Sequence, residues 1–220
     1  MLKSKEEERV ICLLKNKNIS FVVMIVMGIV SVSTFWGFSF AGVAVIIGIV
    51  FFFINTTRED DSLRFKSIGT HLRDKSLWFW IALPVIVNVV CNVLAIFFLP
   101  DFFEHIKSRT DFIFSVSQLL FVVLQFAFFA LGEEIAWRGF FQKQLSKQLP
   151  IIPTLIVTSI LFSLCHFQTG DVAVVSYDLF FIFINSIIYG IIFYKTNNAW
   201  ISAISHFIAN LSAFIMMSFL

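Results

Sequence analysis

The sequence predicts an all-α fold, a polytopic transmembrane bundle of about seven helices that forms a single integral membrane domain over residues 1–220. Two observations carry this prediction. First, 59% of the residues are hydrophobic and 30 of the 220 are Phe, against roughly 45 to 50% apolar usage in soluble domains. Second, several hydrophobic blocks approach the roughly 20 residues that cross about 30 Å of hydrocarbon. The blocks are residues 19–36, 38–54, 77–100, 112–137, 150–168, 172–194 and 199–219.

The connections between these blocks follow from their length and charge. Only a short turn at residues 36–38 joins the first two blocks, so we expect a tight hairpin. The only sizeable polar insert is at residues 56–76. In the alternative, residues 139–149 extend the fourth block as an interfacial amphipathic segment, and the bundle has eight spans. We expect the charged residues 1–18 to stay with the first block as an anchor, because no small-residue cleavage site closes that block.

The distribution of basic residues predicts the orientation in the membrane. Lys and Arg in short flanking segments favour the cytoplasmic side. With seven spans, fourteen Lys and Arg side chains fall on the side of the N-terminus, and only Lys107 and Arg109 fall on the other. The N-terminus is therefore predicted to be cytoplasmic. Short loops and a bias toward Phe, Ile, Lys and Asn favour a bacterial plasma-membrane protein.

Composition also excludes some classes of function. The net charge is only +2, and the basic residues lie at helix ends and in loops rather than along one stripe. This argues against a nucleic-acid partner. The three cysteines, Cys12, Cys91 and Cys165, are odd in number and lack C-x-x-C spacing, so they do not form a disulfide framework.

Ionisable residues inside the fourth block are the first indication of function. Such groups cost roughly 2.5 to 3.5 kcal/mol each at bilayer depth on insertion scales, so they mark a functional site by default. Glu134 and Arg138 are four residues apart, which places them on one face of a helix as a pair. Glu133 points about 100° away and is left free. The alternative is that all three are interfacial charges at the cytoplasmic end of the block.

Two later blocks add further polar groups. His166 closes the fifth block, with Phe162 one turn earlier, where it can pack against the imidazole ring. His206 and Asn210 are four residues apart and project from one face of the seventh block. A His and an amide aimed at one point can donate two hydrogen bonds to a developing oxyanion. Hydrogen bonding between helices is the alternative for all three polar groups.

Other polar residues in the blocks are explained by helix packing. They are Asn88, Asn92, Gln118, Gln125, Asn185 and Tyr189. Asp178 needs a partner because it is a carboxylate inside the sixth block, but the sequence assigns it no role.

These residues together resemble the motifs of a known family. Glu-Glu-x-x-x-Arg at 133–138, Phe-x-x-x-His at 162–166 and His-x-x-x-Asn at 206–210 are similar, in order, to the three motifs of the CAAX protease and bacteriocin-processing family, also called the Abi family. That family includes the eukaryotic Ras-converting endopeptidase. The resemblance covers a protease core of about residues 112–219, whereas the first 110 residues contribute only hydropathy.

The resemblance implies an intramembrane endopeptidase that cleaves membrane-associated or lipidated peptides and proteins, with the bilayer and these substrates as its partners. By position, Glu133 and His166 would activate the attacking water, and His206 and Asn210 would hold the oxyanion. Glu134 and Arg138 would support the site from behind. The family has been described both as metal-free glutamate proteases and as metalloproteases. We favour the glutamic type without a cofactor, and Glu133, His166 and His206 are the zinc ligands of the alternative.

The helix lengths place His166 at a different depth in the membrane from Glu133 and His206. At 1.5 Å per residue, Glu133 lies about 10 to 15 Å from the cytoplasmic end of an extended fourth block, and His206 about 10 Å from the start of the seventh. His166, counted from Ile151, lies about 22 Å deep. We expect strong tilt, or a fifth helix that starts after Pro153, to bring His166 level.

Two other functions fit polar residues in a membrane. One is a non-catalytic scaffold or a bacteriocin self-immunity protein of the same fold, since fold alone does not imply function. The other is a transporter or proton relay, which predicts broken helices and an inverted repeat. The sequence contains no such symmetry, so the protease is favoured.

Overall fold

The computed structural model describes residues 17–36, 41–56, 62–114 and 119–218. The charged residues 1–16 and the turn residues Gly37 and Phe38, on which two predictions fall, lie outside this part of the chain. Every regular element in the described residues is a helix, which confirms the all-α prediction. The helices are α2 (Lys17–Ser33), η1 (Thr34–Trp36), α3 (Ala41–Asn55), η2 (Phe65–Ser67), α4 (Ile68–His71), α5 (Lys75–Phe98), α6 (Phe102–Phe114), α7 (Leu119–Glu134), η3 (Ile135–Gln142), α8 (Lys143–Leu145), α9 (Ile151–Leu164), α10 (Val172–Thr196) and α11 (Ala199–Met217).

Five helical runs are long and apolar enough to cross a membrane, which makes the chain a multi-pass membrane protein. They are Asn18–Trp36, Lys75–Phe98, Leu120–Leu145, Val172–Thr196 and Ala199–Met217. Two other predicted blocks form shorter apolar helices: α3 has 15 residues and α9 has 14. At 1.5 Å per residue these are only about 21 to 23 Å long. A count of seven or eight spans is therefore not confirmed.

The fourth block differs from its prediction at both ends. Its first residues, expected to begin the span at 112, belong instead to α6, an amphipathic helix that begins at Phe102, between the predicted third and fourth blocks. At its other end α7 continues through the π-helical η3 and α8 to Leu145. Residues 139–145 thus prolong the same helical run instead of forming a separate crossing.

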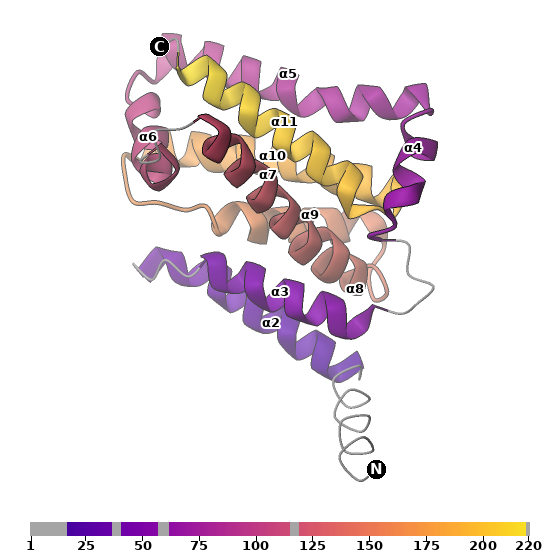
Figure 1. The fold of residues 1–220 in the computed structure, drawn as a ribbon. Helices are drawn as coiled ribbons and strands as arrows, with labels where there is room; N and C mark the ends of the chain where they lie inside the picture. Colours follow the sequence, from indigo (N-terminus) through magenta and orange to yellow (C-terminus); the bar gives the residue numbers. More distant parts are fainter. Residues whose placement is uncertain (1–16, 37–40, 57–61, 115–118, 219–220) are drawn as a thin grey trace, which may run out of the picture.

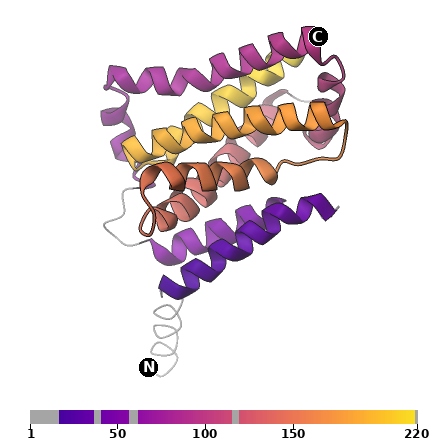
Figure 2. The same ribbon diagram turned by 180° about the vertical axis from the view of Figure 1, so that it is seen from behind.

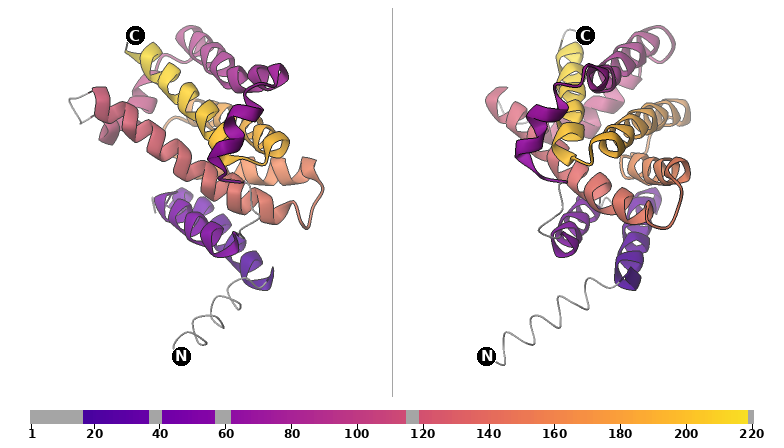
Figure 3. Two further views of the ribbon diagram at one scale, coloured as in Figure 1. Left: turned by 45° about the vertical axis from the view of Figure 1, so that its right-hand side comes forward. Right: turned by 90° about the vertical axis from the view of Figure 1, so that its right-hand side faces the viewer.

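The helices are stacked in successive layers (Figures 1 and 2). The hairpin of α2 and α3 lies at one side of the bundle and α5 at the opposite side, with α7, α9, α10 and α11 between them. The contacts agree with this order, because α3 packs on η3, α9 on α10, and α11 on both α7 and α5. The short helices α4 and α6 lie at opposite ends of the bundle, as the side views also show (Figure 3).

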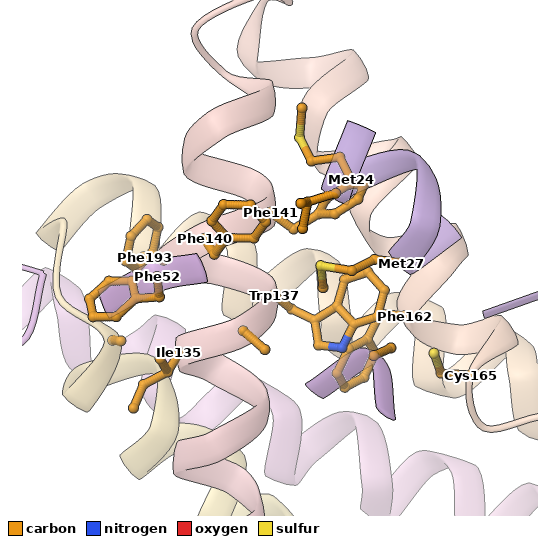
Figure 4. Packing of buried hydrophobic residues seen from close by; sticks show 14 residues of the cluster. Met24, Met27, Phe52, Ile135, Trp137, Phe140, Phe141, Phe162, Cys165 and Phe193 are labelled. Atoms are coloured by element: carbon orange, nitrogen blue, oxygen red, sulfur yellow. The ribbon is translucent and has the colours of Figure 1, made fainter. Parts of the chain in front are cut away.

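The largest hydrophobic cluster surrounds η3. All eight residues of η3 are buried, and the cluster joins them to α2 and α3 on one side and to α9 on the other. Figure 4 shows Trp137 beside Met27 of α2 and Phe162 of α9, and the Trp137 and Phe162 ring centroids are 6.0 Å apart. The N-terminal hairpin is therefore packed directly against the helix that carries the first motif.

The polar insert is folded where the structure describes it. The Asn198 amide donates hydrogen bonds to the Arg64 carbonyl at 3.0 Å and to the Ser67 hydroxyl at 2.9 Å. The Trp200 indole donates to the Leu63 carbonyl at 3.2 Å. Residues 62–67 therefore hold the start of α11, the helix that carries His206.

Gly48 marks the closest approach between α3 and η3. A Cβ atom at this position would lie 2.6 Å from the Ala136 Cβ and 2.8 Å from the Ala136 Cα. We expect Gly48→Ala to lower the free energy of unfolding by about 1 to 3 kcal/mol, because the backbone of η3 would have to move. Thermal unfolding in detergent micelles measures this. Gly42→Ala in the same helix is the control, because nothing lies within 4 Å of its added Cβ; an equal loss in both variants would contradict the prediction.

Candidate active site

Glu133 and Glu134 lie at the end of α7, immediately before the π-helical segment. Single π-helical turns within α-helices are frequent at functional sites. The two carboxylates point in different directions, as the helical spacing predicted. The Glu134 side chain is fully buried, whereas the Glu133 side chain is 22% exposed. One acid is therefore enclosed by protein, and the other remains accessible.

Glu134 pairs with Arg138, which confirms the predicted pair. Their Oε2 and Nε atoms are 3.3 Å apart and both side chains have no exposed surface. Arg138 Nη2 also donates hydrogen bonds to the Ser186 hydroxyl at 3.1 Å and to the Ser186 carbonyl at 3.2 Å. The guanidinium lies over the Phe162 ring, 4.7 Å from its centroid. A buried charge pair of this kind needs such additional partners to offset its loss of hydration.

The same carboxylate holds His206. The His206 Nδ1 atom lies 3.1 Å from the Glu134 Oε1 atom, and the Tyr189 ring stacks on the imidazole with centroids 4.5 Å apart and planes inclined by 19°. His206 and Tyr189 are both buried. The imidazole ring is thus fixed by a hydrogen bond at its edge and by an aromatic ring on its face.

Glu133 faces two histidines from two other helical segments. Its Oε2 atom lies 4.0 Å from His166 Nε2 and 3.9 Å from His206 Nε2. This oxygen is buried and has no hydrogen-bond partner among the described residues. The His166 Nδ1 atom lies 2.9 Å from the Phe162 carbonyl oxygen, and the Phe162 ring packs on the imidazole at 4.8 Å, as expected. The three motifs therefore meet around one unpaired carboxylate oxygen.

The expected mismatch in depth is resolved by the length of the first motif's helix. Neither Pro153 nor a late start is involved, because α9 begins at Ile151. Instead the helical run that carries Glu133 continues to Leu145, which puts Glu133 about 18 Å from its end. His166, about 22 Å from Ile151, is then nearly level with it. The predicted depth of about 10 to 15 Å for Glu133 was too small, because the extended helix continues to Leu145.

The tautomers of both histidines follow from their Nδ1 partners. A carbonyl or carboxylate oxygen can only accept a hydrogen bond, so His166 Nδ1 and His206 Nδ1 each carry a proton. Each Nε2 atom of a neutral ring then presents a lone pair. Two such lone pairs and a carboxylate oxygen cannot bond to one another directly, because all three accept hydrogen bonds.

This geometry does not match a preformed zinc site. Zinc ligands at about 2.0 to 2.1 Å in a tetrahedron lie about 3.3 Å from one another, against 3.9 and 4.0 Å here. Within the described residues, no group of three or more His, Cys, Asp or Glu side chains has the arrangement that holds a metal ion. Glu133, His166 and His206 are thus brought together, at two separations about 0.6 Å longer than those between tetrahedral zinc ligands.

Asn210 is not drawn into this network. It is half-buried on α11, and among the described residues its amide makes no hydrogen bond to Glu133, His166 or His206. The neighbouring Ala209 carbonyl accepts a hydrogen bond from the Asn88 amide at 2.8 Å. The role of Asn210 stays a prediction.

Two residues of α10 that support the site were missed or misassigned from the sequence. Tyr189 was attributed to helix packing, and Ser186 was not considered. They are three residues apart on one helix face, a spacing that could have identified them. The packing role is confirmed for Asn185 and Asn88, whose side chains are hydrogen-bonded to each other at 2.8 Å between α10 and α5.

Asp178 has a partner in a helix that was not predicted. Its Oδ2 atom lies 3.4 Å from His105 Nε2, and both side chains are less than a tenth exposed. His105 belongs to α6, so the pair joins α6 to α10, away from Glu133. His105 lies between two predicted blocks, so hydropathy provided no reason to connect these two residues.

The apolar helices of this chain enclose a buried cluster of carboxylates, histidines and an arginine. The chain is therefore a multi-pass membrane protein with a polar site among its membrane helices. A comparison with protein-family models matches residues 115–212 to the family described as Type II CAAX prenyl endopeptidase Rce1-like. The matched segment contains all three motifs, which supports the resemblance to the CAAX protease family. The match supports a CAAX-type intramembrane protease in general. Comparisons with curated proteins and with solved structures found no match.

Proposed function

We propose that the protein is an intramembrane endopeptidase that hydrolyses peptide bonds of membrane-associated or lipidated peptides and proteins, with a water molecule activated by Glu133. One observation carries this proposal: the buried Glu133 Oε2 atom has no hydrogen-bond partner within the described part of the chain and lies about equally far from two histidine Nε2 atoms. A polar contact longer than 3.5 Å is one that a single water molecule can bridge.

The tautomer of His166 suits it to place this water. Its Nε2 lone pair accepts one hydrogen of the water while Glu133 accepts the other, so the water oxygen is directed at the substrate carbonyl carbon. As the new C–O bond forms, Glu133 takes the water proton. It then gives this proton to the departing amine nitrogen as the C–N bond breaks, and a carboxyl and an amine terminus result.

His206 is placed to stabilise the oxyanion. Its Nδ1 proton is committed to Glu134, so its Nε2 atom donates a hydrogen bond only when the ring is an imidazolium. Asn210, one turn further along α11, supplies the second donor once substrate is bound.

The direction from which substrate arrives follows from the predicted orientation. With the N-terminus in the cytoplasm of a bacterial cell, the site opens toward the cytoplasmic side of the plasma membrane or laterally to lipid. The exposed fractions of Glu133 (22%) and His166 (28%) support access to this side of the cluster.

The test is hydrolysis of quenched fluorescent peptides by the protein purified in lipid nanodiscs. One probe ends in a farnesylated Cys followed by two aliphatic residues and a variable residue, and the other has the same sequence without the farnesyl group. We expect cleavage of a probe, and no loss of activity after treatment with 1,10-phenanthroline. Loss of activity on chelation with recovery on adding Zn²⁺ would contradict the metal-free mechanism, and failure to cleave either probe would count against the protease.

A further inference from the structure

The end of the first helix lies against the residues that flank His166. The Thr34 hydroxyl of η1 donates a hydrogen bond to the Leu164 carbonyl at 3.0 Å. The Cys165 thiol donates to the Ser31 hydroxyl at 3.0 Å, and the Phe35 ring packs on Phe167 with centroids 4.2 Å apart. Each residue from 164 to 167 other than His166 therefore has a partner in residues 31–35, which we call the N-terminal clamp.

The residues that make the polar contacts of the clamp are buried. Ser31 has no exposed surface, and Thr34 and Cys165 are 6% and 7% exposed. The Ser31 hydroxyl donates a hydrogen bond to the Met27 carbonyl at 2.8 Å, and its oxygen accepts one from the Cys165 thiol. The Thr34 hydroxyl also lies 3.0 Å from the Ser31 carbonyl. The single Thr34 hydroxyl proton is therefore shared between the Ser31 and Leu164 carbonyl oxygens.

The clamp acts where α9 stops. The carbonyl of Leu164, the last residue of α9, accepts a hydrogen bond from the Phe167 N–H at 3.1 Å and a second one from Thr34, and the His166 N–H donates to the Ser163 carbonyl at 2.9 Å. His166 follows two residues later, and the His166 Nδ1 contact to the Phe162 carbonyl fixes only the orientation of the ring. The backbone position of His166, and with it the distance to Glu133, depends on how the chain leaves α9.

We propose that the N-terminal clamp is a positioning element for His166, so that residues outside the family match of 115–212 set the geometry of the active site. This inference rests on the proposed function. It also gives the N-terminal hairpin a task beyond crossing the membrane. A displacement of about 1 Å in a group that orients a reactant can lower the rate about a hundredfold, so contacts of this kind act on turnover more than on binding.

The test compares Thr34→Val with Thr34→Ser in the peptide assay. Valine keeps the side-chain volume but removes the hydroxyl, so we expect kcat to fall about tenfold while KM changes by less than about twofold. Serine restores the donor, so we expect it to keep most of the activity. Ser33→Ala is the matched control, because the Ser33 hydroxyl bonds only to the Val30 carbonyl, in its own helix, at 2.7 Å.

Wild type and Glu133→Gln are measured first. If wild type does not cleave the probes, the proposed function fails. If wild type cleaves and Thr34→Val has wild-type kcat, or if Thr34→Ser is as impaired as Thr34→Val, the clamp proposal alone is overturned. Should Thr34→Val not accumulate, Phe35→Leu serves instead: this ring is 46% exposed, so its loss is tolerated by the fold, and wild-type kcat in that variant would equally overturn the proposal.

Discussion

Glu133→Gln is expected to abolish peptide cleavage while leaving the protein folded. Glutamine keeps the shape of the side chain but cannot take a proton from water, and general base catalysis contributes about 10² to 10⁴ in rate. Because Glu133 is 22% exposed and its buried oxygen makes no hydrogen bond in the described structure, its removal should cost little stability. The measurement is kcat for the purified variant, together with its thermal midpoint.

Glu104→Gln is the control for this variant. Glu104 is an exposed acid in the first turn of α6, away from the cluster. We expect this variant to retain wild-type kcat. Residual activity of Glu133→Gln above a few per cent of wild type, with unchanged stability, would mean that another group activates the water.

Arg138→Met should produce the largest loss of stability of any single change in the site. It removes the charge beside the fully buried Glu134 and the donor to Ser186. An uncompensated buried charge costs about 3 to 5 kcal/mol. The loss is measured as a lowered midpoint of unfolding when the detergent-solubilised variant is titrated with a denaturing detergent.

The double variant Glu134→Gln, Arg138→Met separates this cause from loss of packing. With the carboxylate gone, no charge is left unpaired, so the double variant should be more stable than Arg138→Met alone. If both are equally unstable, the loss comes from the packing of the arginine on the Phe162 ring, and the charge argument is wrong.

Hydropathy alone predicted the long apolar helices but not the short or amphipathic ones. Long apolar blocks identify helices α5, α10 and α11 within a few residues, because charged residues stop them. Hydropathy does not distinguish a 14-residue helix that ends inside the bundle from a full crossing, and α9 was therefore read as a span to residue 168. The amphipathic α6 was missed because its charges resemble those of a loop.

The site could be predicted where a contact is local in sequence. Glu134 with Arg138 and Phe162 with His166 are each four residues apart, so helical geometry alone puts them together. The contacts of Tyr189 with His206 and of Thr34 with Leu164 depend on how separate helices pack. No periodicity in one sequence encodes such contacts, and they emerge only from the folded structure.

The most direct test of Glu133-dependent proteolysis is a comparison of peptide termini in membranes from cells that carry the wild type or Glu133→Gln at equal abundance. Mass spectrometry of terminally labelled membrane peptides identifies the new ends that hydrolysis creates. We expect termini that are present with the wild type and absent with Glu133→Gln. The sequences of these termini identify the substrate. Identical sets of termini from both cell lines, under conditions where the gene affects growth, would contradict the protease and favour a non-catalytic role in the membrane.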